Sequence, residues 1–461
     1  MLKATLRSAV LLGLLVWSVP GFAEVQNVKV GGDITARAFY RKNLDLHDEN
    51  GGNTQGLDSD RFFMTTTGIN IGADLTENVS TFVRLANERD WGIVAVAPNN
   101  NSDLALSQSY VTFKELFYSP LTVRIGRQPI VWGRGFVLGS NLIPSILGRG
   151  DDIHASITAN EFTDFTAFDG IRATLDLSHL GGLNLPLTAE YVYIKENENS
   201  IGSNDDVNLQ GVNFSAKFDK MGSEAEIYYL NKRDKSTGTS ANDNFGSVST
   251  MGVRGSLKPA EGLYAYSELA WQFGQQAADV SGVLPAGGSQ QAWAFDLGAD
   301  YTFAQVPTTP KIGFEWIFWS GKDVNGAVNG WDPIARGYYT TALREFQTAT
   351  AGGFYGTDQA GDTAAATNQH QFAFYGSLKP VADLTISPRL TFFALDRGAL
   401  PVTGSKRKGY AGAEWDTNIV YDYTSDVQFG LLYAMFAPGN VYRTPNDSVA
   451  QELVSTVSVK F

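Results

Sequence analysis

The sequence has no cysteine among its 461 residues and only four histidines. Without cysteine, the chain cannot be a disulfide-stapled scaffold and cannot carry a thiolate metal site. The histidines are scattered and none has the spacing of metal ligands; they are His47, His154, His179 and His370. We therefore expect neither a metal nor a cofactor.

A catalytic constellation is also missing. The stretch DDIHAS brings Asp152, His154 and Ser156 close together in the chain. A catalytic triad is defined by its geometry in space, however, and not by proximity in sequence. We expect no catalytic residues here and predict that the protein is not an enzyme.

The chain lacks an excess of basic residues and, beyond its first residues, long apolar runs. Its formal net charge is −13 at pH 7, which argues against nucleic acid as a partner. A membrane-spanning helix needs roughly 20 consecutive apolar residues, and no stretch after the N-terminal segment approaches that length. Any passage across a membrane must therefore use strands.

The N-terminal segment has the pattern of a secretory signal peptide. Lys3 and Arg7 precede an apolar run from Ala9 to Val19, and the small residues Gly21 and Ala23 follow. This order predicts cleavage after Ala23. We expect residues 1–23 to be the signal and residues 24–461 to form one exported domain of a Gram-negative cell.

Aromatic residues and a period of two are abundant. The stretch AWAFDLGADYTF places Trp293, Phe295 and Tyr301 on one face and charged residues on the other. The C-terminal QELVSTVSVKF alternates in the same way and ends on Phe461. Alternation of this kind, with aromatics at both ends of the apolar face, is typical of strands that separate lipid from a wet lumen.

Short turns and long polar loops follow one another along the chain. Their alternation predicts about eighteen strands in an all-β, antiparallel, up-and-down transmembrane barrel, with short periplasmic turns and long extracellular loops. A closed barrel leaves no unpaired strand edge in the bilayer. We expect the strand that ends at Phe461 to close the sheet against the first strand, Val28–Arg41.

Some charged residues are expected to line and narrow the pore. Structureless loops as long as the one over residues 128–169 are uncommon and usually functional. This loop either folds into the lumen or remains an extracellular flap. In total, the residues that we predict to line the pore or its constriction are Arg37, Arg84, Arg124, Arg127, Arg134, Glu414, Asp416 and Asp422.

Two stretches resemble the alginate-export family of bacterial outer-membrane porins: RIGRQPIVWGRGFVLGS and YAGAEWDTNIVYDYTSDVQFGLLYAMFAPGN. The first is similar to the family's Gly-Arg-Gln strand end with its loop, and the second to its penultimate hairpin. The resemblance implies an eighteen-stranded barrel and passive transport, with alginate as the cargo of the best-known members. It also implies an arginine-rich pore, whereas acidic residues outnumber basic ones among the charges that we place inward here.

The function that we predict is a porin-like channel for hydrophilic solutes, among them an anionic oligo- or polysaccharide. One alternative is an outer-membrane enzyme, and the other is a structural or adhesive barrel with a plugged lumen. The expected partners are outer-membrane lipid and lipopolysaccharide, the β-barrel assembly machinery and a small hydrophilic or saccharide solute.

Overall fold

The structure is a computed structural model of the chain. It describes residues 27–44, 46, 59–92, 104–117, 120–139, 157–178, 186–198, 206–235, 246–276, 289–321, 328–337, 339–345, 367–399, 408–442 and 447–461. The predicted signal peptide lies outside them. Within these ranges, no helix has both the length and the apolar character needed to cross a membrane.

One antiparallel sheet makes up nearly all of the fold. In chain order its strands are β1 (Asn27–Lys42), β2 (Ser59–Thr76), β3 (Val79–Asp90), β4 (Ala105–Phe113), β5 (Leu121–Gln128), β6 (Phe168–Asp176), β7 (Leu187–Asn197), β8 (Val207–Phe218), β9 (Ser223–Asp234), β10 (Gly246–Ala260), β11 (Leu263–Gln275), β12 (Ser289–Thr302), β13 (Lys311–Trp319), β14 (Val328–Asn329), β15 (Gln369–Val381), β16 (Leu384–Ala399), β17 (Lys408–Asp422), β18 (Val427–Pro438) and β19 (Ala450–Lys460).

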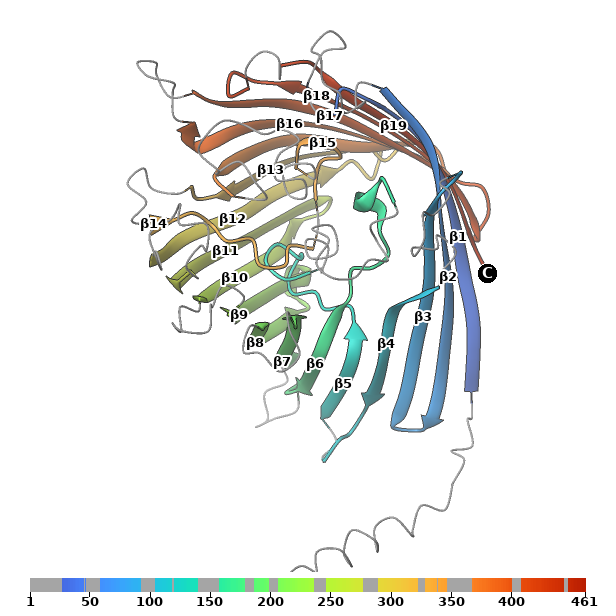
Figure 1. Cartoon of the computed structure of the whole chain (residues 1–461), viewed down its shortest axis with the longest axis vertical. Helices are drawn as coiled ribbons and strands as arrows, with labels where there is room; N and C mark the ends of the chain where they lie inside the picture. The colour runs from blue at the N-terminus through green and yellow to red at the C-terminus, as the bar shows by residue number, and fades with distance from the viewer. Residues whose placement is uncertain are drawn as a thin grey trace, which may run out of the picture.

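The sheet closes on itself, and the predicted barrel is confirmed. Each long strand pairs with its neighbours in the chain, and β1 pairs with both β2 and β19. The two-residue β14 is an extra parallel pairing on β12, so eighteen strands form the wall. Figure 1 shows β1 and β19 side by side at this seam.

Phe461 takes part in the closure, as the terminal alternation predicts. Its backbone N–H donates to the carbonyl of Gly32 at 3.0 Å, and the Gly32 N–H donates back to Phe461 at 2.8 Å. Leu453 and Val457 are exposed on the outer face of β19, whereas Glu452 is buried on the inner face. The period of two therefore separates an apolar outside from a polar inside.

The lumen is partly filled by chain that leaves the wall. Residues 129–139 and 157–167, between β5 and β6, form the first inward segment, which includes the short helix η1 (Asn160–Phe162). Residues 330–337 and 339–345, between β14 and β15, form the second inward segment. Figure 1 shows parts of both segments inside the ring of strands.

Candidate functional site

The first inward segment enters the lumen and is held by acidic side chains of the wall strands. Trp132 donates from Nε1 to the Glu190 carboxylate of β7 at 2.5 Å. The next backbone N–H, of Gly133, donates to Glu226 of β9 at 2.9 Å. The described parts of this loop therefore fold into the lumen, the first of the two arrangements considered above.

Arg134 follows directly in the same segment. Its guanidinium is 3.3 Å from Glu315 and 3.5 Å from Asp296, and its Cζ is 3.7 Å from the ring centre of Tyr266. Glu315 also binds Arg389 from the other side and accepts a hydrogen bond from the Tyr266 hydroxyl. Bound to protein carboxylates, Arg134 offers a passing anion less positive charge than an unpaired arginine would.

The returning part of the first inward segment binds β1 and β3. Arg84 is held between Asp33 at 2.7 Å and Asp164 at 2.8 Å. Glu88 accepts hydrogen bonds from the Asp164 N–H and the Thr163 hydroxyl. These contacts fix this part of the loop to the wall.

Two further arginines on β1 face the same segment. Arg37 donates to the Thr66 hydroxyl at 3.3 Å, and its guanidinium lies 4.7 Å from the ring centre of Phe162. Arg41, which we did not place at the constriction, binds both Glu161 and Glu452, the latter at 2.6 Å. Arg37 and Arg84 thus face the segment that narrows the lumen.

Arg124 and Arg127 lie on opposite faces of β5. Arg124 points inward, where it donates to Thr112 at 3.3 Å and stacks 4.4 Å from the ring centre of Tyr110. Arg127 shares the outward face with the exposed Ile125 and pairs with Asp169 at 3.0 Å. Arg127 therefore points away from the lumen that the sequence analysis expected it to line.

The second inward segment is organised around buried charges. Arg336 and Glu345 form an ion pair in which both side chains are buried. Glu345 also accepts hydrogen bonds from the Thr341 N–H and the Gln371 amide, each at 3.2 Å. Burial raises the pKa of Tyr339 in this segment to about 12, so its phenol stays neutral at physiological pH.

Glu414 anchors this segment to β17. Its two carboxylate oxygens accept the backbone N–H groups of Leu343 at 2.6 Å and Arg344 at 2.7 Å. The side chain is fully buried beneath the segment. The structure thus places Glu414 inside the barrel, as a group that positions the chain, with its oxygens occupied by backbone donors.

The two inward segments touch each other through glycines. The Gly139 N–H donates to Ala335 at 2.7 Å, and the Gly337 N–H donates to Gly135 at 2.6 Å. A Cβ atom on Gly337 would lie 2.4 Å from the Cα of Gly139. The segments can approach this closely only because neither residue carries a side chain.

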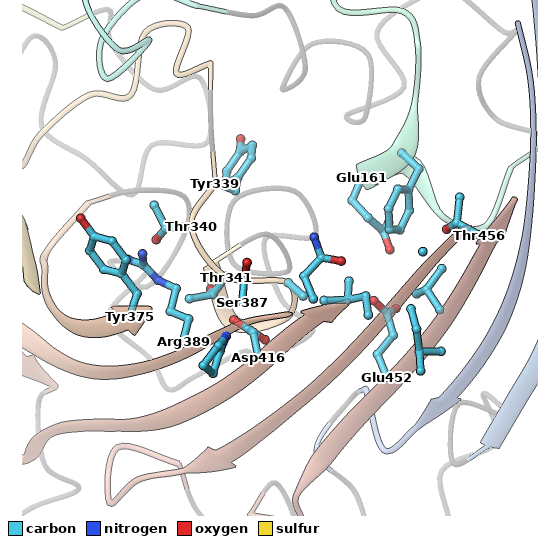
Figure 2. A pocket seen from close by; sticks show the side chains of 18 of the residues that line it. Glu161, Tyr339, Thr340, Thr341, Tyr375, Ser387, Arg389, Asp416, Glu452 and Thr456 are labelled. Atoms are coloured by element: carbon cyan, nitrogen blue, oxygen red, sulfur yellow. The ribbon is translucent and has the colours of Figure 1, made fainter. Parts of the chain in front are cut away.

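A cavity of about 840 Å³ remains between these segments and the wall from β13 to β19. Hydroxyls of Thr340, Thr341 and Ser387 line it, and Figure 2 shows them around Asp416 and Arg389. Its far end carries Glu161 and Glu452. A polar chamber of this size accommodates a small solute together with water.

Asp416 lines this chamber, whereas Asp422 does not. Asp422 lies six residues further along the same inward face, near the short-turn end, where it is exposed and accepts a hydrogen bond from Gln428 at 2.7 Å. The structure therefore gathers Arg134, Glu414 and Asp416 around the inward segments and leaves Asp422 at the barrel rim.

Histidine offers little support for catalysis. His370 accepts a hydrogen bond from Trp316 at 3.3 Å and packs among aromatic rings, and the other three histidines lie outside the described residues. Within the ranges that the structure describes, no group of three His, Cys, Asp or Glu residues has metal-binding geometry.

Sequence reasoning missed the second inward segment entirely. The signal that could have revealed it is the run from Trp331 through Ile334 to Tyr339, because bulky apolar residues are unusual in a solvated loop and all three are largely covered here.

Comparison with known proteins agrees with this architecture. The family described as alginate export matches residues 26–456. No curated protein matches the chain.

Several solved porins share the fold. A BenF-like porin of Pseudomonas fluorescens Pf-5 is 13% identical, with a TM-score of 0.53 over 95% of this chain and 100% of that one. Pseudomonas aeruginosa OccK9 is 11% identical, with a TM-score of 0.55 over 95% and 99%. Pseudomonas aeruginosa OccK2, solved with glucuronate, is 13% identical, with a TM-score of 0.52 over 94% and 96%.

These structural likenesses show the fold alone, and the family match covers most of the sequence. Together they place the barrel in the bacterial outer membrane and identify it as a channel-type protein. The chain belongs to the alginate export family.

Proposed function

We propose that the protein is a passive channel for small hydrophilic solutes, which cross the lumen through the chamber beside the two inward segments. The observation that carries this proposal is the cavity of about 840 Å³, which is lined by hydroxyls and charged groups of the barrel wall. A chamber of that size is matched to a solute of a few rings or fewer.

An anionic oligo- or polysaccharide is the finer candidate that the family description supports. The charges of the lumen favour smaller and less anionic cargo. Arg41, Arg84, Arg134 and Arg389 each bind protein carboxylates. A polyanion would have to compete with those carboxylates for every guanidinium.

A plugged structural barrel is the alternative that a specific observation favours. Apolar residues of the first inward segment, among them Ile130, Trp132 and Phe136, pack with wall residues into one buried cluster. That cluster fills part of the lumen, and a barrel filled throughout would conduct nothing. The enzyme alternative gains no comparable support from the described side chains.

Liposome swelling and planar-bilayer recording test the proposal together. Liposomes that contain the protein are expected to swell with monosaccharides and disaccharides and to exclude alginate-sized chains. Discrete conductance steps in KCl should accompany this. Entry of long uronate polymers would contradict the small-solute proposal, and the absence of both swelling and conductance would favour the plugged barrel.

Two partners complete the proposal. The exposed apolar outer face of strands such as β19 suits the lipid of the outer membrane and its lipopolysaccharide. We also propose that the C-terminal strand ending in Phe461 is what the β-barrel assembly machinery recognises. Deleting residues 457–461 should then lower the amount of protein in the outer membrane, measured on membrane fractions.

A further inference from the structure

Two exposed arginines lie on the outer face of the barrel, where β2 and β3 border the long loops. They are Arg61 of β2 and Arg89 of β3. The Arg61 guanidinium lies 5.2 Å from the ring centre of Tyr40, its cross-strand partner on β1. Long loops of outer-membrane barrels are extracellular, so this end of the strands lies in the outer leaflet of the membrane.

An exposed aromatic pair lies between the levels of the two arginines. Phe63 of β2 and Trp91, just beyond β3, stack with their ring centres 5.0 Å apart, and they are 50% and 52% exposed. The Trp91 indole donates from Nε1 to the hydroxyl of Thr65 at 2.6 Å, and Thr65 is the cross-strand partner of Arg89. Aromatic side chains of membrane proteins gather at the depth of the lipid headgroups. Arg61 and Arg89 are therefore at headgroup depth.

Carboxylates are absent from this face within the described residues of β1, β2 and β3. Side chains alternate between the two faces of a strand, and every acidic residue of these strands has the inward parity. The inward acidic residues are Asp33, Asp60, Asp74, Glu88 and Asp90. The charged residues of outward parity are Lys42, Arg61 and Arg89. The outer face of these strands thus carries positive charge alone.

The outer face of β5 to β7 differs at the same end of the barrel. There Arg127 pairs with Asp169 at 3.0 Å. Lys195 pairs with Asp206 at 2.7 Å and also with Glu198. The protein itself neutralises those cations. On β2 and β3 the face supplies no such carboxylate, so two guanidiniums can bind an anion from outside the protein.

We propose that the outer face of β1 to β3 binds lipopolysaccharide, with Arg61 and Arg89 bound to the phosphates of its headgroup. This inference deepens the lipid partnership proposed above and does not depend on conduction. The headgroup is a disaccharide with a phosphate at each end. Arg89 lies opposite Thr65, four residues from Arg61, which separates the two backbones by about 14 Å at a rise of about 3.4 Å per residue. That separation suits two phosphates better than one.

The lower part of the same face fits the acyl chains of the lipid. Ile34 of β1 and Ile71 of β2 are exposed there, nearer the short-turn end. Guanidiniums above and aliphatic side chains below follow the order of headgroup and acyl chain in an outer-leaflet lipid. Arginine is the cation suited to this role, because its planar fork binds two phosphate oxygens at once. Figure 1 shows β1, β2 and β3 as adjacent long strands of the wall.

Native mass spectrometry of the detergent-solubilised full-length protein tests this without requiring conduction. The probe is lipid A, the phosphorylated glycolipid anchor of lipopolysaccharide, and the comparison is the same lipid A after removal of its phosphates. An arginine beside an anionic headgroup contributes about fivefold to affinity, so the phosphorylated form should bind at least about tenfold more tightly. Phosphatidylglycerol, which carries a single phosphate, should bind more weakly than lipid A.

The variants are the double variant Arg61→Gln with Arg89→Gln and the control Arg127→Gln. All these changes remove guanidiniums from the outer face near the long loops, but Arg127 is bound to Asp169. The double variant should weaken lipid A binding at least about tenfold, and R127Q should leave it within about twofold. Each single variant is expected to weaken binding about fivefold, and the single variants carry the test if the double variant does not fold.

Several results would overturn the inference. They are equal affinity for the two forms of lipid A, equal affinity for lipid A and phosphatidylglycerol, equal losses in R127Q and the arginine variants of β2 and β3, or unchanged binding in those variants. Conductance recorded on the same preparations separates this inference from the proposed function. A conducting protein without a preference for lipid A loses only the inference, and a protein that binds lipid A but never conducts loses only the channel.

Discussion

The lumen has two halves built from the same alternating strands but filled differently. On the side of β7 to β13, which we call the packed half, the first inward segment inserts Ile130, Trp132 and Phe136 into a buried apolar cluster. On the side of β15 to β19, the open half, the wall presents Ser387, Asp416 and Thr456 to a chamber of about 840 Å³.

The comparison shows how inward segments fill one half of a wide barrel with packed side chains and leave a polar chamber in the other half. The packed half resembles the core of a soluble protein because bulky apolar side chains are buried together there. The open half leaves a chamber lined by polar and charged groups. Both inward segments lie along the boundary, so their attachment decides the width of the passage.

The largest effect is expected from detaching the second inward segment. Glu345→Ala leaves Arg336 buried without its carboxylate and frees the Thr341 N–H and the Gln371 amide. Breaking a buried pair from one side costs about 3–5 kcal/mol. Single-channel conductance should therefore rise several-fold, because the segment leaves the lumen.

The control for this change is the double variant Arg336→Met with Glu345→Met. Replacing both partners by apolar side chains removes both buried charges and should restore conductance to near the wild-type value. A conductance in E345A equal to that of the wild type would show that the segment does not limit the passage.

Trp132→Ala is expected to have the next largest effect, on the packed half. It removes a buried indole from the apolar cluster and the hydrogen bond to Glu190. A truncation of this kind costs about 3–5 kcal/mol when the site cannot collapse. A folded barrel is expected to migrate differently on a gel from the heat-denatured chain. The temperature at which migration changes from the folded to the denatured position should be lower for W132A than for the wild type, and the single-channel current should become noisier.

Trp132→Phe separates the two contributions, since it keeps a ring in the cluster and removes only the N–H donor. We expect it to lie between the wild type and W132A. Equal behaviour of W132F and W132A would mean that the hydrogen bond to Glu190, and not the apolar packing, holds the first inward segment.

A smaller effect is expected where the segments meet. Gly337→Ala forces a Cβ to within 2.4 Å of the Cα of Gly139, so the two segments must separate slightly. Overpacking of this kind costs about 1–3 kcal/mol. Gly430→Ala is the matched control, because its Cβ would meet only Thr456 at an ordinary 3.4 Å. Channel noise should increase in G337A and not in G430A.

The smallest effect concerns charge alone. Arg134→Gln leaves Glu315 with one fewer cation in the lumen, whereas Arg127→Gln removes a charge from the outer face. Arg134 is partly exposed, and its contact contributes about 1 kcal/mol or less. Reversal potentials in a KCl gradient should shift toward cation selectivity in R134Q and stay unchanged in R127Q. A shift in R127Q without a shift in R134Q would contradict the placement of Arg134 in the lumen and of Arg127 on the outer face.

The wall of the barrel was predictable from sequence because its signal is local. The alternation in β12, β17 and β19 reads directly from neighbouring residues, and the closure of β19 on β1 follows from the need to pair both edges. The same parity assigns Asp416 to the lumen. Parity on β5 also assigns Arg127 to the outside, once that strand is known to run to Gln128.

The filling of the lumen was not predictable, because its contacts are distant in the chain. The Leu343 N–H meets Glu414, 71 residues away, and Arg134 meets Glu315, 181 residues away. No sequence pattern within either loop indicates which wall residues it contacts. The sequence shows that Glu414 faces inward, but only the fold shows that backbone donors occupy its oxygens.

The junction between β1 and β19 joins the first and last strands of the chain, so it is expected to form last during assembly. The hydroxyls of Thr35 and Ser458 are 3.0 Å apart in space and 423 positions apart in the chain. Every hairpin of the wall can form as soon as its two strands exist, but this last junction must wait for the final residues. Until then the earliest strand carries an open edge, the kind that recruits stray strands. The barrel thus remains vulnerable to misassembly until the backbone of Phe461 pairs with that of Gly32.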